Sequence, residues 1–372
     1  IPFILGWDVS KWAIRAVVLL VAAAPCALVM STPIAVAAGI GIAGKHGVLI
    51  KGGMYLEELG KIKAVAFDKT GTLTIGKPVV TEVIAFNGDK DHVLKSAYSV
   101  ERMSEHPLAQ AIVEKARERN LTSYEITKFE SFTGSGVKAS VNGEVIYVGR
   151  PELFEELELN IEHIKSDIEK LTQDGKTVML IGTLEKINGI IAVRDEIRPE
   201  ATEIISDLHS MGIKVIMLTG DNENTARAIS KEIGIDDFKA ELKPEDKIKA
   251  IENLEKEYGA VAMVGDGVND APALARATVG IAMGTAGTDA AIEAADVALM
   301  ADDITKVSYA IRLGKRAKKI SFQNIVFSLL ILIVLVPSAL LGILTVAIAV
   351  LFHEISELLA VANGLRVAAG QQ

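Results

Sequence analysis

Two long stretches without a charged residue, residues 16–43 and 325–352, constrain this chain more than any other feature. A helix that crosses a lipid bilayer needs ~20 apolar residues, so each stretch is long enough to span one. Pro25 and Pro33 interrupt the first stretch, and a proline kinks a helix. Inside a membrane such a break is tolerated where the backbone is buried or lines a cavity. The alternative, a buried helix of a soluble core, is disfavoured by the length.

The second stretch is too long for a single helix, because apolar residues resume after Ser356 and Glu357. Pro337 and Gly342 offer a break, so we expect two helices joined by a tight turn near residues 341–343. Lysines and arginines flank these three spanning segments, at positions 45, 51, 61 and 63 and between 312 and 319. Positive residues favour the cytoplasmic side. This predicts a multi-pass protein of the plasma membrane, with the large middle region and the C-terminus in the cytoplasm.

The region between the spanning segments reads as an ordinary soluble α/β protein. The formal net charge of −9 argues against a nucleic-acid partner, since nucleic-acid surfaces are basic. Cys26 is the only cysteine, which excludes an internal disulfide framework and a Cys-x-x-Cys metal module. The chain begins with Ile1 and shows no signal-peptide pattern, so we interpret it as part of a longer protein.

Apolar strands alternate with helical patterns along this region. We expect strands at residues 64–67, 214–218 and 260–264, and helices at residues 225–233, 247–258 and 271–277. Strands that alternate with helices indicate a doubly wound α/β fold with a parallel sheet. In open α/β sheets the ligand binds at the carboxyl ends of the strands, and each expected strand is followed there by a turn that contains aspartate.

The strongest chemical signal is the string Asp68-Lys69-Thr70-Gly71-Thr72-Leu73-Thr74. It follows the first expected strand, so its leading carboxylate faces a ligand crevice. The glycine lets backbone N–H groups turn toward an anion. Aspartate is a covalent nucleophile toward phosphate in enzymes. A lone aspartate in a turn can be purely structural, but that interpretation does not account for the whole string.

Two further turns follow the other strands. The hydroxyl of Thr219 and the free amides around Asp221 can hold phosphoryl oxygens. Asp266 and Asp270 offer the hard oxygen ligands that Mg²⁺ prefers. Lys247, which is expected near the start of a helix, can neutralise phosphate charge. A single Gly-Asp turn is common, so the inference depends on three acidic turns that converge on one crevice.

Together these strings resemble the P-type ATPase family, whose phosphorylation domain has a haloacid-dehalogenase-like fold. The resemblance covers essentially the whole chain. It implies that Asp68 is the phosphorylated nucleophile and that ATP is the phosphate donor. It places Asp68, Thr70, Asp266 and Asp270 around Mg²⁺. It also implies a set of residues around the phosphate, namely Thr219, Asp221, Lys247 and Asn269.

The middle of the chain resembles the nucleotide-binding domain of the heavy-metal branch of this family. The marker is Ser104-Glu105-His106-Pro107, and the nucleotide-site glycines are matched by Gly134, Gly136 and Gly149. The resemblance implies an adenine site, with Glu101 and Glu105 helping to orient the base and His106. A lone histidine is more often structural, and a Gly-x-Gly alone is weak, so the inference rests on their place in this insertion.

Ala24-Pro25-Cys26 lies within the first spanning segment, where the heavy-metal branch carries Cys-Pro-Cys or Ser-Pro-Cys. We expect Cys26, His353 and Glu354 to form one site for the transported ion, because thiolate and imidazole suit soft or borderline metals. Ionisable groups in spanning segments are functional by default. Alternatively, Cys26 is a small apolar residue and His353 and Glu354 reach the membrane interface. Ala24 replaces the usual first ligand, which weakens a copper interpretation.

The resemblance implies an α/β fold with an inserted α+β nucleotide-binding domain and flanking transmembrane helices. The expected membrane segment covers residues 1–44, and the stalk with the first part of the phosphorylation domain covers residues 45–78. The nucleotide-binding domain is expected at residues 79–190 and the second part of the phosphorylation domain at residues 191–305. Residues 306–372 are expected to form a stalk and two transmembrane helices, with the C-terminus.

The resulting interpretation is a C-terminal fragment of an ATP-driven exporter of Zn²⁺ or Cd²⁺, with Co²⁺ next. Its expected partners are the transported divalent ion, the lipid bilayer, and the earlier helices and actuator domain of the same pump. The family's actuator carries Thr-Gly-Glu, which does not occur here, so we expect no turnover by this chain alone. The alternatives are a Cu⁺ pump, a haloacid-dehalogenase-like phosphatase and a non-enzymatic metal-binding membrane protein.

Overall fold

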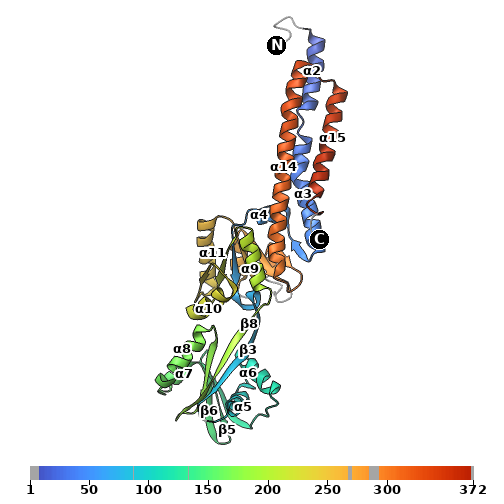
Figure 1. The fold of residues 1–372 in the computed structure, drawn as a ribbon. Coiled ribbons are helices and arrows are strands. Elements are labelled where there is room, and N and C mark those ends of the chain that lie inside the picture. The colour runs from blue at the N-terminus through green and yellow to red at the C-terminus, as the bar shows by residue number, and fades with distance from the viewer. Residues whose placement is uncertain (1–7, 87, 133, 267–269, 285–292, 370–372) are drawn as a thin grey trace. The chain divides into compact units, whose positions relative to one another are not determined.

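The structure is a computed structural model that describes residues 8–86, 88–132, 134–266, 270–284 and 293–369. The chain divides into two compact units. The first comprises Ile1–Ala64, Ile251–Met263 and Ala271–Gln372, and the second comprises Val65–Ala250 and Val264–Asp270. Figure 1 shows the course of the chain through both.

In the first unit, four helices form the apolar part. They are α2 (Val9–Ala22), α3 (Cys26–Lys45), α14 (Thr305–Leu341) and α15 (Val346–Leu365). Figure 1 shows them side by side, and α3 contacts both α14 and α15. Three segments are long and apolar enough to cross a membrane, namely α2 with α3, α14, and α15. The three expected spanning segments are therefore confirmed.

Proline and glycine shape these helices as the sequence indicates. Pro25 separates α2 from α3, since a proline cannot continue the hydrogen bonding of the helix before it. Gly342 ends α14 with φ of 76°, a left-handed conformation that favours glycine. Small residues on α3 recur every fourth position and are buried, which lets neighbouring helices approach closely: Ala27, Ser31, Ala35, Gly39 and Ala43.

The first unit also holds short soluble elements. Its strands lie in the order β1 (Val48–Ile50), β13 (Val297–Leu299), β12 (Val279–Met283) and β11 (Val261–Gly265), the last of which ends in the second unit. β12 and β13 are parallel, whereas β1 pairs antiparallel at the edge. Helices α4 (Gly53–Leu59) and α12 (Ala271–Arg276) belong to the same unit.

The second unit contains a group of neighbouring strands, and the last two of them are parallel. The end of β11, β2 (Ala64–Asp68), β9 (Lys214–Leu218) and β10 (Asp237–Lys239) are neighbours in that order. β2 and β11 are buried along their whole length, as expected for strands covered on both faces. The accompanying helices are α9 (Ala201–Ser210), α10 (Glu223–Ile233) and the first part of α11 (Pro244–Tyr258), whose residues from Ile251 belong to the first unit.

A second, antiparallel sheet lies within the same unit. Its six strands have the order β3 (Thr74–Ala85), β8 (Ile187–Ile197), β7 (Thr177–Gly182), β6 (Glu144–Gly149), β5 (Gly136–Val141) and β4 (Ile126–Phe132). Helices α5 (Lys90–Glu101), α6 (Pro107–Glu118), α7 (Pro151–Glu156) and α8 (Lys165–Gln173) accompany it, with the short turn η2 (Glu162–Ile164). The expected boundaries at residues 79 and 190 fall inside β3 and β8.

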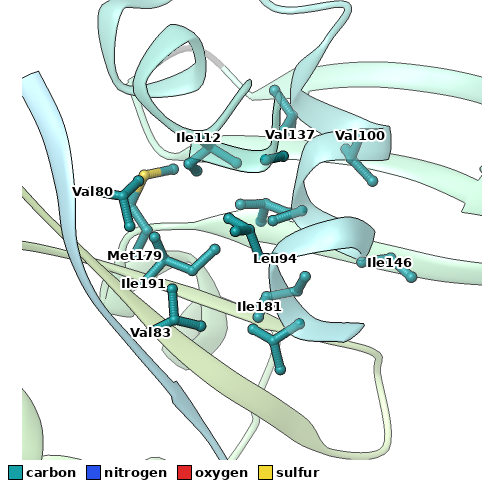
Figure 2. Packing of buried hydrophobic residues seen from close by; sticks show 14 of the residues in the cluster. Val80, Val83, Leu94, Val100, Ile112, Val137, Ile146, Met179, Ile181 and Ile191 are labelled. Atoms are coloured by element: carbon teal, nitrogen blue, oxygen red, sulfur yellow. The ribbon is translucent and has the colours of Figure 1, made fainter. Parts of the chain in front are cut away.

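Both faces of this sheet are covered around strands β7 and β8, which are buried at successive positions. Met179 and Ile181 of β7 pack into one core with Leu94 and Ile112 from α5 and α6, as Figure 2 shows. Val178 and Leu180, one residue away, lie in the opposite core. Successive side chains of a strand point to opposite faces, so one strand contributes to both cores.

Candidate functional site

Asp68 lies at the carboxyl end of buried strand β2 and is followed by the tight turn η1 (Lys69–Leu73). Gly71 within this turn has φ of 73°, which favours glycine. A Cβ at position 71 would lie 2.7 Å from Asp266 Oδ2. Two features therefore require glycine at position 71, namely the left-handed backbone conformation and the close approach of the Asp266 carboxylate.

Lys247 joins two carboxylates at the centre of the site. Its Nζ donates to Asp68 Oδ1 and to Asp270 Oδ1, each at 2.5 Å, and all three side chains are buried. Lys247 lies in the first turn of α11, three residues after the Pro244 that begins this helix. The helix thus begins three residues earlier than expected, because proline is favoured in the first turn.

The charges of this cluster do not balance within the described residues. Burial, together with the negative charge of Asp270, raises the pKa of Asp68 to about 7 and outweighs the effect of Lys247. Burial alone would lower the pKa of Lys247, but the two carboxylates outweigh it and raise that pKa. One ammonium between two buried carboxylates leaves an excess of negative charge, which favours an added cation.

Thr219 and Asp221 follow β9 and approach the same site. The Asp221 backbone N–H donates to Thr219 Oγ1 at 3.1 Å. The Asp221 carboxylate accepts from Lys69 Nζ at 2.6 Å, and Lys69 is itself buried. Lys69 was not among the expected site residues. Its place beside Asp68 was the only sequence signal available, since its partner lies far along the chain.

A cavity of about 290 Å³ collects these residues: Asp68, Thr70, Thr219, Gly220, Asp221, Leu242, Pro244, Lys247, Asp266 and Asp270. Seven of the eight residues expected around Mg²⁺ and phosphate are therefore brought together. The eighth, Asn269, lies outside the described residues. Carboxylates, a threonine and a buried ammonium around one cavity suit a phosphoryl group with a hard cation.

A separate cavity of about 120 Å³ lies in the antiparallel sheet region. Glu101, His106, Gly134, Gly136 and Gly149 line it. Two other expected residues, Glu105 and Pro107, do not line it. Pro107 is the first residue of α6, where proline is favoured, so it positions the preceding histidine.

Two features shape this cavity. Gly136 and Gly149 face each other in the β5–β6 pair, and a Cβ at position 149 would lie 2.6 Å from Leu153 Cδ2. His106 caps α6, because its Nδ1 accepts the Leu108 N–H at 3.2 Å. Burial raises the pKa of Glu101 to about 7 despite its hydrogen bond with Ser104. A largely apolar cavity with a carboxyl group of raised pKa and an imidazole suits a flat heterocycle with donors and acceptors.

A small pocket within the spanning helices contains Cys26 and His353. Its other polar side chains are Ser328 and Ser356, neither of which was expected as a ligand. His353 Nε2 is buried and has no hydrogen-bond partner in the described chain. Glu354 is exposed and does not line this pocket. The structure thus brings together two of the three expected ligands, and no described group of three or more His, Cys, Asp or Glu residues is arranged to hold a metal ion.

Comparison with known proteins gives three similarities. Residues 62–278 match the family "Hydrolase: haloacid dehalogenase-like hydrolase". The chain is 47% identical over 377 residues to a "Probable cadmium-transporting ATPase" of Listeria monocytogenes, covering 98% of this chain and 53% of that protein. It is 42% identical to a "Zinc-transporting ATPase" of Bacillus subtilis, covering 98% and 57% respectively. The chain thus spans about half the length of the curated relatives it matches.

A solved structure is similar over nearly the whole chain. It is the crystal structure of a zinc-transporting PIB-type ATPase in the E2.Pi state, with a TM-score of 0.87 and 39% sequence identity. The similarity covers 99% of this chain and 60% of that one. At this identity the likeness concerns sequence as well as fold.

Proposed function

Because the chain belongs to the haloacid dehalogenase-like hydrolases, and among them to the metal-transporting P-type ATPases, we propose that it is the phosphorylated core of an ATP-driven exporter of Zn²⁺ or Cd²⁺, with Co²⁺ next. The observation that carries this proposal is the position of Asp68, which lies at a strand end in one cavity with Lys247, Asp270 and Thr219. That arrangement combines a nucleophile with groups that bind a phosphoryl anion.

In the proposed reaction, a carboxylate oxygen of Asp68 attacks the γ-phosphorus of ATP. The bond from that phosphorus to the bridging oxygen breaks, ADP leaves with the electron pair, and an acyl phosphate forms on Asp68. Lys247 and the Thr219 hydroxyl stabilise the charge on the transferred group. Asp221, held by Lys69 at 2.6 Å, keeps the Thr219 turn in place. Asn269 is proposed to contact the same phosphate.

Mg²⁺ fits the donor set of this cavity. Asp68, Thr70, Asp266 and Asp270 would hold it, and the excess of carboxylates over ammonium groups supports this assignment. When bound, the ion neutralises charge on the phosphoryl oxygens. The side chain of Lys247 supplies a permanent positive charge beside Asp68.

The adenine base is proposed to occupy the cavity between α6 and the β5–β6 pair. His106, with its Nδ1 already bonded to the Leu108 N–H, presents the ring to the base, while Gly136 and Gly149 leave room for it. The raised pKa of Glu101 favours its protonated form, which can donate to a ring nitrogen. Glu105 is exposed and is proposed to influence this site only indirectly.

The exported ion is proposed to bind at Cys26 and His353. The buried, unpartnered Nε2 of His353 beside the Cys26 pocket supports this, since an orphaned imidazole nitrogen is a ready ligand. Ser328 and Ser356 add hydroxyl oxygens. One thiolate with one imidazole suits Zn²⁺ or Cd²⁺, whereas Cu⁺ favours sets of thiolates and thioethers.

Trapping a phosphoenzyme from γ-labelled ATP tests this proposal. We expect an acid-stable label that hydroxylamine removes, as an acyl phosphate requires. A simple phosphatase of the same superfamily would not incorporate label from ATP, and a non-enzymatic metal-binding protein would form none. Absence of a hydroxylamine-sensitive label in the natural protein, under conditions in which it binds ATP, would overturn the assignment.

A further inference from the structure

A cavity of about 560 Å³ lies where the spanning helices of the first unit become charged. Residues of α3, α4 and α14 line it. Four lysines are among them, Lys61, Lys315, Lys318 and Lys319, and Glu57 is the only acidic residue in the lining. The cavity is unrelated to the phosphate, adenine and ion sites, and it carries a clear excess of positive charge.

Two of these lysines are available to a ligand. Lys61 is held by Glu58, with Nζ 2.7 Å from Oε1. Lys318 and Lys319 are exposed, and across the described ranges of the chain neither side chain takes part in a hydrogen bond or an ion pair. They are adjacent on α14 and line the same cavity. Anions that enter the cavity therefore meet two unneutralised ammonium groups.

The same face of α14 changes from cationic to apolar along its length. The lining positions 315, 318, 319, 322 and 325 follow helical spacing, so they share one face. Phe322 is 65% exposed, and Val36 of α3 contributes to the apolar part of the lining. A free phosphate ion would contact only the lysines and leave the apolar part of the lining in water. An amphipathic anion would cover both the lysines and the apolar part.

The position of the cavity favours a lipid. Helix α14 has 37 residues and is therefore about 55 Å long, whereas the hydrocarbon core of a bilayer is about 30 Å thick. The uncharged run begins directly after Lys319, so Lys315 to Lys319 lie at the membrane surface on the side of the soluble elements. Lysine clusters immediately outside a spanning helix attract anionic headgroups.

We propose that this cavity binds an anionic phospholipid of that leaflet. Lys318 and Lys319 contact the headgroup phosphate, and Phe322 packs against an acyl chain. This assignment concerns a ligand other than ATP or the transported ion, and it does not depend on the proposed transport function.

The test measures retention of phosphatidylglycerol by the purified natural protein in phosphatidylcholine nanodiscs, using native mass spectrometry over a series of lipid ratios. Lys318→Gln with Lys319→Gln should raise the mole fraction for half occupancy at least fivefold. Lys318→Arg with Lys319→Arg, which keeps both charges, should stay within twofold. Lys45→Gln removes an exposed charge from the last turn of α3 outside this cavity and should also stay within twofold.

Further variants and competitors distinguish binding of a lipid from binding of a free anion and from coverage of the cavity by a protein segment. Phe322→Ala should weaken phosphatidylglycerol binding, while inorganic phosphate and glycerol phosphate should fail to compete. Equal competition by these soluble phosphates would overturn the lipid assignment. An equal loss of phosphatidylglycerol binding in Lys45→Gln and in the double variant Lys318→Gln with Lys319→Gln would also overturn it. The assignment would likewise be wrong if no lipid were retained because another part of the natural protein fills the cavity.

Discussion

At the scale of single residues, the proposed phosphorylation depends on how Asp68 is held. Lys247 contacts Asp68 and Asp270 equally, so replacing Asp68 leaves the lysine with one buried carboxylate partner. Asp68→Asn keeps the shape of the side chain and removes the anionic nucleophile. We expect phosphate incorporation to fall at least a hundredfold, while ATP affinity stays within about threefold. Unchanged acid-stable incorporation in this variant would remove Asp68 from its proposed role.

A second prediction concerns Glu101, which is 3% exposed and has a pKa raised to about 7 by burial. The ordinary pKa of a glutamate side chain is 4.5, so above pH 4.5 the unfolded chain loses this proton more readily than the folded chain does. The carboxyl group therefore lowers the free energy of unfolding as the pH rises. This penalty grows until about pH 7, where it reaches roughly 3 kcal/mol. Below pH 4.5 it is absent.

Glu101→Gln should therefore stabilise the protein relative to the parent more strongly at pH 8 than at pH 4.5. The measurement is the free energy of unfolding of parent and variant by urea at both values of pH. The advantage of the variant over the parent should increase by up to roughly 3 kcal/mol between them. An equal difference at both values would show that Glu101 is not held in its neutral form.

Much of the site could be anticipated at this scale. Asp68, Asp221, Asp266 and Asp270 each follow an apolar strand, and carboxyl ends of parallel strands meet at one edge. The contacts themselves could not be predicted, because the Lys69–Asp221 pair joins residues 152 positions apart. Likewise, an acidic residue near a helix end gives no indication of burial, so the raised pKa of Glu101 emerges only from the packing around it.

At the scale of elements, the β5–β6 pair makes the clearest structural demand. Gly136 and Gly149 face each other, and a Cβ at position 136 would lie 2.6 Å from Gly149 Cα and 2.8 Å from Leu153 Cδ2. Gly136→Ala should therefore overpack this pair, which typically costs about 1–3 kcal/mol. Because the same residues line the adenine cavity, ATP affinity should fall at least tenfold.

The measurement combines thermal unfolding with calorimetric titration of ATP. Val145→Ala is the matched control, since this valine lies on β6 but is exposed. It should leave both quantities nearly unchanged. If Gly136→Ala bound ATP as tightly as the parent, the cavity beside β5 and β6 would not be the adenine site.

Elements with strong local signals were predicted well. The helix expected at residues 225–233 is α10, whose Asn222 accepts the Thr225 N–H and whose following Gly234 is left-handed. The order of the antiparallel strands was not predictable, because β3 pairs with β8 across more than a hundred residues. Local propensity does not determine which distant strands become neighbours.

At the scale of the whole molecule, the membrane pocket should govern which ion activates the catalytic site. In the natural protein, Cys26→Ala and His353→Ala should each raise the Zn²⁺ or Cd²⁺ concentration for half-maximal phosphorylation at least tenfold, with ATP binding intact. Ser338→Ala, on α14 but outside the pocket, is the control. Glu354→Gln should have a smaller effect, because Glu354 does not line the pocket.

A metal titration of the phosphoenzyme provides this comparison for Zn²⁺, Cd²⁺, Co²⁺ and Cu⁺. Preferential activation by Cu⁺ would favour the alternative copper pump. Unchanged activation by all four ions in both the Cys26 and His353 variants would place the ion site elsewhere. The three spanning segments were predictable from uncharged length alone, whereas the separation of Glu354 from the pocket depends on the rotation of α15 about its axis.

The most direct measurement identifies the phosphorylated atom. The natural protein is phosphorylated with ATP, quenched in acid, reduced with borohydride, which converts an aspartyl phosphate to homoserine, and digested for mass spectrometry. We expect homoserine at position 68 in the peptide that contains β2, and no homoserine there in Asp68→Asn. Homoserine at another aspartate, or a phosphorylated protein without any homoserine at position 68, would contradict it.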